Sequence, residues 1–293
     1  MQLAANGIRL EVEEHGSPSG EPLLLVMGLG MQLLGWHEGL VELLVERGFR
    51  VIRFDNRDSG LSERFDHLGV PNLKMDSLRH VLGVRIRSPY ALADMAADAI
   101  ALLDALGIAS AHVCGASMGG MIAQHMALIA PARVKSLTLM MTSSGARHLP
   151  GPSLKVRGAL ISRPLSNTLK AIVEHHVRLH DLIGSPAYPQ PREALHDRFT
   201  RSVRRSYRPA GAARQMVAIA ADGDRSPKLR AIRAPTLVIH GHADPLVPVA
   251  AGRDLQAKIA AARIDLVDGM GHDLPDALWP RFVDGIASVA GRA

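Results

Sequence analysis

The sequence predicts an α/β protein built on a doubly wound, mostly parallel sheet with a helical cap insertion. Strand-like and helix-like segments alternate along most of its 293 residues, an order in which helices join parallel strands. Several strand-like segments are continuous apolar runs, the pattern of strands buried on both faces of a parallel sheet. The alternation lapses over residues 142–233. We therefore expect residues 1–141 and 234–293 to form the core, and 142–233 to form the cap.

The first half of the chain opens as a hairpin and then alternates. Residues 1–15 vary in polarity around Asn6-Gly7, a dipeptide that favours two-residue turns. The predicted elements that follow are a strand at 22–27, a helix at 36–47, strands at 50–54 and 111–115, helices at 90–106 and 121–130, and a strand at 134–141. Residues 63–88 have no regular pattern, so we expect irregular surface chain there.

The second half begins with the proposed cap, in which prolines separate short helical pieces. This stretch holds Pro150, Pro152, Pro164, Pro186, Pro189, Pro191 and Pro209 between the helical pieces. The alternation then resumes with a strand at 235–240, a helix near 250–261, a strand at 263–267 and a last helix after Pro280. This return to strands and helices indicates that both ends of the chain belong to one sheet.

Composition and length narrow the class of protein. A hydrophobic content of 47% with 21% charged residues is typical of a globular chain. Cys114 is the only cysteine, which excludes an internal disulfide and a cysteine-based metal site. Residues 1–16 lack the pattern of a signal peptide, and the longest apolar runs, such as 23–31, fall short of the roughly 20 residues of a membrane span. We expect a cytoplasmic protein without a membrane partner.

The positive charge is concentrated in the predicted cap. The net charge is +6, yet residues 146–230 carry 16 Lys or Arg against 6 Asp or Glu. No helix-turn-helix, zinc-finger or base-stacking pattern accompanies this excess, so we expect no nucleic-acid partner. Within residues 196–208, one helical face would carry Asp197, Arg201, Arg204, Arg205 and Arg208. These arginines form either a solvated surface or a basic region that draws anionic substrates toward the site.

One segment predicts a nucleophile. Gly115-Ala116-Ser117-Met118-Gly119 lies between a predicted strand and a predicted helix, the setting in which Gly-x-Ser-x-Gly forms a nucleophile elbow. A side chain at either glycine would collide with the neighbouring strand or helix. A serine hydroxyl needs a base beside it, and the base needs an orienting acid.

The partners of Ser117 are sought at the carboxyl ends of strands, where groups converge in an open parallel sheet. Asp244 follows the strand at 235–240, and His272 follows the strand at 263–267. Serine, aspartate and histidine occur in this order, 127 and 28 residues apart. We predict that Ser117 is the nucleophile, His272 the base and Asp244 the orienting acid. Asp268 and Asp273 are closer to His272 in sequence, but neither should reach its far ring nitrogen.

The remaining predicted groups would bind the substrate. Backbone N–H groups of Met118 and of Leu29, in a glycine-flanked loop after the first buried strand, would form the oxyanion hole. Gly28, Trp36 and Met141 are candidates for the substrate pocket.

A metal site is the main rival interpretation. His240-x-His242-x-Asp244 imitates the start of a metallo-hydrolase motif, but such sites need further ligands in strict geometry. His240 lies in a predicted strand and Pro245 follows at once, so we expect no metal. His175, His176 and His180 lie on a predicted helix and are explained by a solvated helix face.

Taken together, these motifs resemble those of the α/β-hydrolase superfamily over about residues 3–290. The quoted marks are Met27-Gly28-Leu29-Gly30, Phe54-Asp55-Asn56-Arg57 with Gly60 and Ser62, Gly115 to Gly119, Gly241 to Pro245, and Gly269 to His272. Met27-Gly28 with Gly35-Trp36 is similar to the aclacinomycin methylesterase branch. Met27 stands where many members have histidine, which removes a polar support of the loop. The resemblance implies ester hydrolysis through an acyl-enzyme without a cofactor.

Two classes of function remain open from the sequence. The first is a serine hydrolase of small-to-medium carboxylic esters, with lactone, amide or carbon–carbon bond hydrolysis as alternatives on the same triad. The second is a non-catalytic ligand-binding protein on a hydrolase fold, against which the intact Ser117, Asp244 and His272 argue. A serine at 117 also argues against the haloalkane dehalogenases and epoxide hydrolases that resemble this fold, since those use a carboxylate nucleophile. The oligomeric state is left open.

Overall fold

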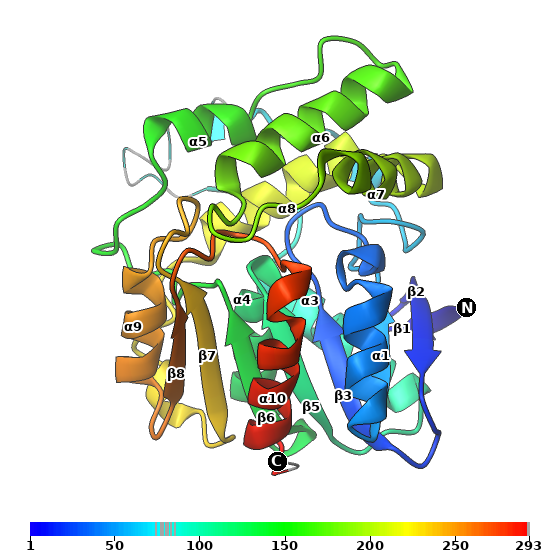
Figure 1. The fold of residues 1–293 in the computed structure, drawn as a ribbon, viewed down its shortest axis with the longest axis vertical. Coiled ribbons are helices and arrows are strands. Elements are labelled where there is room, and N and C mark those ends of the chain that lie inside the picture. Colours follow the sequence, from blue (N-terminus) through cyan, green and yellow to red (C-terminus); the bar gives the residue numbers. More distant parts are fainter. Residues whose placement is uncertain (74, 77–78, 80–81, 83, 85, 292–293) are drawn as a thin grey trace.

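The sheet predicted from the apolar runs is present. The computed structural model describes residues 1–73, 75–76, 79, 82, 84 and 86–291, and these contain an eight-stranded sheet in the order β1-β2-β4-β3-β5-β6-β7-β8 (Figure 1). The strands are β1 (Gln2–Ala5), β2 (Ile8–His15), β3 (Glu21–Val26), β4 (Phe49–Phe54), β5 (Ala111–Ala116), β6 (Val134–Met140), β7 (Thr236–Gly241) and β8 (Arg263–Val267). β1 pairs with β2 and β2 with β4 antiparallel, and all other pairs are parallel. The prediction of a mostly parallel sheet is confirmed.

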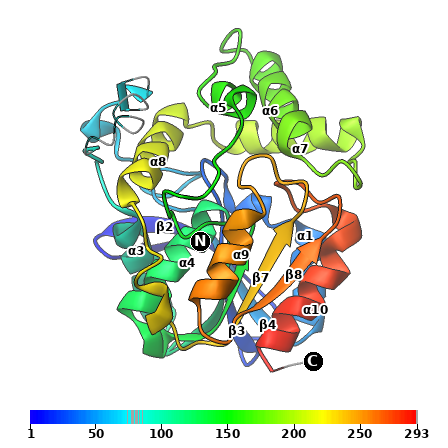
Figure 2. The same ribbon diagram turned by 90° about the vertical axis from the view of Figure 1, so that its left-hand side faces the viewer.

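Helices cover both faces of the sheet. α1 (Glu38–Glu46) and α10 (Trp279–Val289) pack on one face, and α3 (Leu92–Ala105), α4 (Met118–Ile129) and α9 (Ala250–Lys258) pack on the other (Figure 2). Each face of the sheet shares a separate cluster of buried apolar side chains with its helices. This three-layer arrangement holds the carboxyl ends of the parallel strands in fixed positions, which is what a site built from several loops requires.

Short 3₁₀ turns join these elements. They are Leu33–Gly35, Asp66–Leu68, Pro131–Arg133, Leu229–Ala231 and Asp276–Leu278. The first explains why the helix predicted at 36–47 begins at Glu38, and Gly48 ends that helix with a φ of 81°. The irregular stretch predicted at 63–88 is only partly testable, because seven of its residues lie outside the described ones.

Four helices follow β6 and precede β7 in the chain. They are α5 (Leu154–Leu160), α6 (Leu169–Ile183), α7 (Arg192–Arg205) and α8 (Pro209–Asp222), and they lie across the carboxyl ends of the parallel strands (Figures 1 and 2). Their place in the chain is that of the predicted cap; the cap limits of 142–233 stay a prediction. In the part of the chain that the structure describes, no helix is long and apolar enough to cross a membrane.

The histidines of α6 differ from the expected solvated face. The His176 ring stacks on Phe199 of α7 with 5.5 Å between centroids, and the His180 ring meets Phe199 edge-on at 6.2 Å. His175 packs against His176. The prediction was wrong because the apolar face of α6 is covered by α7, with which it forms a small cluster of Val173, Val177, Leu195 and Phe199.

Candidate active site

Ser117 occupies a strained turn between β5 and α4. Its backbone has φ 55° and ψ −121°, a combination that ordinary residues adopt only when surrounding packing imposes it. The two glycines of the motif permit the turn. A Cβ at Gly115 would lie 2.3 Å from the Gly119 carbonyl oxygen, and one at Gly119 would lie 2.0 Å from the Val26 carbonyl oxygen. The backbone of Ser117 is held by a hydrogen bond from its N–H to Met140 O at 2.9 Å.

The structure brings Ser117, His272 and Asp244 together from three loops at the carboxyl edge of the sheet. His272 Nε2 lies 3.0 Å from Ser117 Oγ, and His272 Nδ1 lies 2.8 Å from Asp244 Oδ2. The histidine thus bridges the hydroxyl and the carboxylate through its two ring nitrogens. Asp268, the aspartate rejected from sequence, has a fully exposed side chain near His242.

The Asp244 carboxylate is fixed by its own loop. Its Oδ1 accepts hydrogen bonds from the backbone N–H groups of Leu246 at 2.9 Å and Val247 at 2.8 Å. With Oδ1 engaged by these two donors, Oδ2 is left for His272. The His240 ring lies 3.6 Å from the same Oδ2, and burial lowers the pKa of His240. His240 is therefore a neutral neighbour that does not compete with His272 for the negative charge.

The glycine-flanked loop lies directly against Ser117. A Cβ at Gly28 would be 3.2 Å from Ser117 Cβ, so the backbone of the loop reaches the nucleophile. Leu29 N–H donates no hydrogen bond within the described residues. Met118 is the first residue of α4, where an N–H has no partner inside the helix. Both predicted donors of the oxyanion hole are thus unengaged beside Ser117.

Side chains that the sequence reasoning did not assign hold this loop in place. Asn56 Nδ2 donates to Met27 O at 2.9 Å, and Asp55 Oδ1 accepts from Leu33 N–H at 2.7 Å. Gln215 of α8 accepts from Gly30 N–H through Oε1 at 2.8 Å. Asp55 and Asn56 belong to the motif at residues 54–57, which in the sequence was only a sign of resemblance to the superfamily. Gln215 lies in a helix with no local signal for such a role.

The loop that carries His272 is held by the end of α6. His272 N–H donates to Ile183 O at 2.7 Å, and Gly271 N–H donates to Ser185 Oγ at 2.8 Å. Ser185 Oγ in turn donates to Asp273 Oδ1. Asp273 therefore turns toward the cap, which agrees with the expectation that it does not orient His272.

The predicted pocket residues have different surroundings. Trp36 is fully buried among apolar side chains of α1, α10 and the sheet. A side chain must be accessible to touch a substrate, so this position contradicts the predicted pocket role; Trp36 is a core residue. Gly28 borders Ser117 as described above. Met141 follows β6 with a φ of 42° and is 3% exposed, so its pocket role stays a prediction.

The residues of the metal interpretation point to other partners. His240 Nε2 lies 2.8 Å from Val247 O, and His242 Nε2 lies 3.7 Å from Asp268 Oδ1. Among the described residues, no three His, Cys, Asp or Glu side chains are grouped so that they could hold a metal ion.

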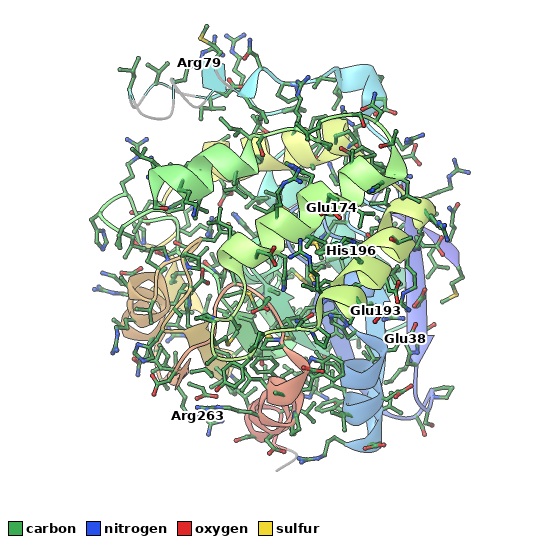
Figure 3. All side chains as sticks on the ribbon, turned by 45° about the horizontal axis from the view of Figure 1, so that its top comes forward. Glu38, Arg79, Glu174, Glu193, His196 and Arg263 are labelled. Atoms are coloured by element: carbon green, nitrogen blue, oxygen red, sulfur yellow. The ribbon has the colours of Figure 1, made fainter. Side chains whose placement is uncertain are left out.

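The basic face predicted on residues 196–208 is divided between contacts and solvent. Arg205 Nη1 donates to Asp55 Oδ2 and to Gln32 Oε1, both at 2.7 Å, and Arg208 Nη1 donates to Ser62 O at 2.6 Å. Arg201 and Arg204 are exposed. Arg205 thus joins the end of α7 to the core, and Arg208 does the same at the start of α8, because α7 ends at Arg205 and the expected face does not continue as one helix. On the α6 side of α7, His196 lies 3.5 Å from Glu174 (Figure 3).

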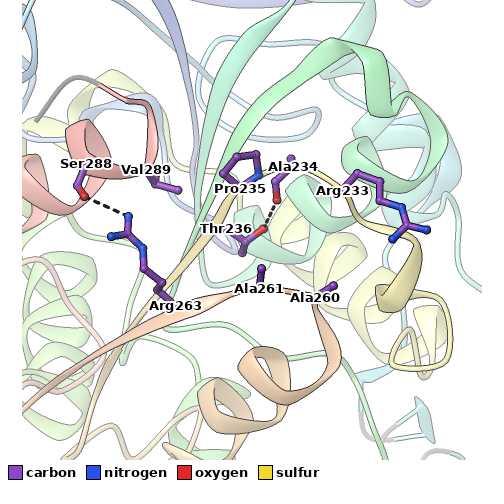
Figure 4. A pocket seen from close by; sticks show the side chains of 9 residues that line it. All are labelled: Arg233, Ala234, Pro235, Thr236, Ala260, Ala261, Arg263, Ser288 and Val289. Carbon is purple, nitrogen blue, oxygen red and sulfur yellow. Dashed lines mark hydrogen bonds between the residues drawn. The ribbon is translucent and has the colours of Figure 1, made fainter.

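A cavity of about 350 Å³ lies far from these groups. It is lined by the amino ends of β7 and β8 and by the end of α10, including Thr236, Arg263 and Ser288 (Figure 4). Reacting groups in parallel sheets converge at the carboxyl ends instead. Despite its size, this cavity is therefore not the candidate active site.

Comparisons with known proteins agree with this fold. A family described as "alpha/beta hydrolase fold" matches residues 21–276. Rhodomycin D methylesterase DauP of Streptomyces sp. (strain C5) is 29% identical, over 94% of this chain and 93% of its own. A 2-hydroxy-6-oxononadienedioate/2-hydroxy-6-oxononatrienedioate hydrolase of Klebsiella pneumoniae is 28% identical, over 90% and 85%. A solved hydrolase structure from Pseudomonas aeruginosa PA01 has a TM-score of 0.72 and 27% identity, covering 99% and 98%.

Proposed function

The chain belongs to the α/β hydrolase fold family, and from that premise we propose that it hydrolyses small-to-medium carboxylic esters through an acyl-enzyme on Ser117. The motifs predicted this family, and the methylesterase relative confirms the likeness to the methylesterase branch. One observation carries the proposal. The side chains of Ser117, His272 and Asp244 form a continuous hydrogen-bonded series at the carboxyl edge of the sheet, with separations of 3.0 and 2.8 Å.

In this proposal each member of the series has a defined task. Asp244 accepts a hydrogen bond from the Nδ1–H of His272, so the unprotonated Nε2 can take the proton of the Ser117 hydroxyl as its oxygen attacks the ester carbonyl. His272 then returns that proton to the departing alcohol. Water, activated by the same nitrogen, attacks the acyl-enzyme and releases the acid.

The negative charge that develops on the carbonyl oxygen needs donors already in place. The N–H groups of Leu29 and Met118 are the proposed donors, since both lie beside Ser117 without a partner. The amino end of α4 adds the positive end of its dipole. Asn56, Asp55 and Gln215 support the Leu29 loop from three sides, which favours a preorganised oxyanion hole.

We propose that residues 142–233 form a cap over this site. Its helices lie across the strand ends (Figure 1), and it bonds to both the oxyanion loop and the His272 loop. The cap therefore forms one wall of the site and takes part in substrate selection.

The methylesterase relative favours an ester with a small alcohol, and a methyl ester is the first substrate to test. Lactone, amide and carbon–carbon bond hydrolysis remain alternatives on the same triad, the last favoured by the Klebsiella relative. The non-enzymatic alternative remains a protein that binds a ligand without catalysing a reaction.

The test is a comparison of the wild-type protein with Ser117→Ala. An organophosphonate should label the wild type once per chain and leave the variant unlabelled, and the variant should lose several orders of magnitude in the hydrolysis of a panel of methyl esters of increasing acyl length. Ser166→Ala, which changes an exposed hydroxyl between α5 and α6, is the matched control and should behave as wild type. Labelling at another residue, or full activity of Ser117→Ala, would contradict the proposal.

A further inference from the structure

A second cavity lies where the cap meets the core on the α1 side. It has a volume of about 230 Å³ and is lined by Leu34, His37, Glu38, Arg198, Arg201 and Trp279, together with Gly39 and Arg53. These residues come from α7, from the starts of α1 and α10, from the Leu33–Gly35 turn and from the end of β4. Figure 3 shows Glu38 at the end of α1 nearest α7. Ser117, Asp244 and His272 do not line this cavity.

Arg198 is a largely buried cation that contacts no carboxylate of the described chain, and Asp273 acts on it only through space. Its Nη1 donates to His37 Nε2 at 3.0 Å and to Gln190 Oε1 at 3.1 Å, and its Nη2 donates to His180 Nδ1 at 3.4 Å. All three acceptors are neutral. Its buried Nε has no hydrogen-bond partner, and Arg198 makes no ion pair within the described residues. Buried charges in proteins are normally paired, because desolvation of an unpaired one is costly.

A second unpaired arginine lines the same cavity. Arg201 lies one helical turn beyond Arg198 and makes neither an ion pair nor a hydrogen bond within the part of the chain that the structure describes. Arg53 is neutralised by Glu13, whose carboxylate accepts its Nε–H at 2.9 Å. Glu38 is the one carboxylate among the lining residues. Among the lining residues, the two arginines without an ion pair therefore outnumber the one carboxylate. Asp273 and Asp276 act on Arg198 and His37 from outside the lining.

The titration of His37 agrees with this excess. Burial, followed by Arg198 and Arg201, lowers the pKa of His37 to about 4. The His37 ring is thus held neutral by burial first, and the two arginines add to this effect against the opposing charge of Asp276.

Apart from its arginines, Glu38 and Gly39, the cavity is lined by two rings and an aliphatic side chain. The His37 and Trp279 rings lie 5.3 Å apart at an interplanar angle of 34°, and Leu34 adds aliphatic surface. The volume exceeds what an inorganic ion needs. A planar aromatic molecule with one carboxylate would pair its carboxylate with the arginines and stack its ring against Trp279.

We propose that this cavity is a binding site for a small aromatic carboxylate, held by Arg198 and Arg201 and distinct from the catalytic centre. The inference does not depend on the esterase activity proposed above.

Benzoate is the probe, and binding is followed by calorimetry and by the fluorescence of Trp279, one of only two tryptophans. Wild type should bind benzoate with a change in tryptophan emission, and benzamide, its neutral analogue, should bind at least about tenfold more weakly, because charge-assisted hydrogen bonds are the stronger ones. Arg201→Gln should weaken benzoate binding about fivefold or more. Glu38→Gln should strengthen it about threefold, since a like charge is removed.

Arg204→Gln is the matched control, because Arg204 is an exposed arginine on the same helix that does not line the cavity; it should bind benzoate as wild type does. Protein labelled at Ser117 with the organophosphonate should also bind benzoate unchanged. Three results would overturn the proposal: no benzoate binding, equal binding of benzamide or inorganic phosphate, or binding that Arg201→Gln leaves intact while the Ser117 label abolishes it.

Discussion

The sheet core and the helices that lie over it are held together by different kinds of contact. The core contains two large clusters of fully buried apolar side chains, one on each face of the sheet. α6 and α7 share only a small cluster of four buried residues. Polar contacts join the cap helices to the core: Arg205 of α7 to Asp55, Arg214 of α8 to Asp58, and Ser185 after α6 to Gly271. Within the described residues, only α8 also adds an apolar contact to the core clusters, through Ala218 and Ile219. Apolar packing thus builds the core, whereas hydrogen bonds and ion pairs, together with the smaller apolar contact of α8, position the cap on it.

This difference assigns separate tasks to the two regions. The side chains proposed to react all come from loops of the core, whereas the side chains that steady those loops come partly from the cap. Substitutions in the first group should abolish catalytic activity. Substitutions in the second group should change stability or reaction rate by smaller factors.

The largest effect is expected from the orienting acid in the core. Asp244→Asn should lower kcat by about a thousandfold or more, because the amide favours the wrong tautomer of His272. Steady-state kinetics with a methyl ester measure this loss. Asp268→Asn is the control and should keep wild-type kinetics, since that carboxylate is exposed. Greater damage from Asp268→Asn would mean that the acid is misassigned.

The next largest effect concerns the clamp between α8 and the core. Arg214 and Asp58 are both 1% exposed, and two hydrogen bonds of 2.7 Å join them. Arg214→Met should lower the free energy of unfolding by roughly 3–5 kcal/mol, because it leaves a buried carboxylate unpaired. Urea unfolding measures the change.

The control for the clamp is an exposed pair. Arg192→Met removes the contact with Asp181 at the surface and should cost less than about 1 kcal/mol. If both variants lose the same stability, polar contacts do not position the cap in the way proposed.

A smaller effect is expected where the cap touches the oxyanion loop. Gln215 is fully buried and also donates to Arg57 O at 2.8 Å. Gln215→Met removes the acceptor of Gly30 N–H and should lower kcat about tenfold, with KM little changed, since the loss falls on the transition state. Gln215→Glu keeps an acceptor and should recover part of the rate. A change in KM alone would assign Gln215 to substrate binding.

Acid should weaken the α6–α7 contact more than the core. Burial, with a smaller contribution from His175, lowers the pKa of His176 to about 4, from 6.5 in the unfolded chain. Between these values the unfolded chain binds more protons, so stability present above about pH 6.5 is lost as the pH falls toward 4. Thermal melts should show a loss of roughly 1–3 kcal/mol from this group. His176→Phe should flatten the profile, whereas His148→Gln, an exposed control, should not.

The smallest effect concerns the exposed charge of α7. If the basic cap steers anionic substrates, kcat/KM for a carboxylate-bearing ester should fall severalfold between low salt and about 0.5 M, while that of a neutral ester stays constant. Arg204→Glu should reproduce the fall at low salt. Arg205 is unsuited to this test because it pairs with Asp55. Equal behaviour of the two esters would leave the exposed arginines as a solvated surface only.

The sequence predicted the core better than the contacts upon it. Apolar runs and helix periodicity are local signals, so each strand could be placed from its own residues. In the same way, residues 111–119 were enough to place the turn at Ser117. The series of Ser117, Asp244 and His272 followed from strand ends, which a parallel topology brings together. Trp36 was misjudged because a residue after a functional loop can turn either to the site or to the core, and sequence does not distinguish the two.

Contacts between distant segments left no such signal. Gln215 meets Gly30 across 185 positions of the chain, and no spacing rule predicts that pairing. The histidines of α6 were expected in solvent because their helix was considered by itself, without α7 against it. The position of the cap helices therefore had to come from the structure.

The hydrogen bonds from α6 to the His272 loop and from α8 to the Gly30 loop have a consequence for timing. A hinged opening that lifted both helices would break the bonds at Ile183, Ser185 and Gln215 together. The base loop and the oxyanion loop would lose their supports in the same event. Substrate or water could then not enter by that route while the site is assembled. Water that enters while the cap is raised meets a site whose base loop and oxyanion loop are unsupported. The acyl-enzyme is therefore hydrolysed only after the cap has closed.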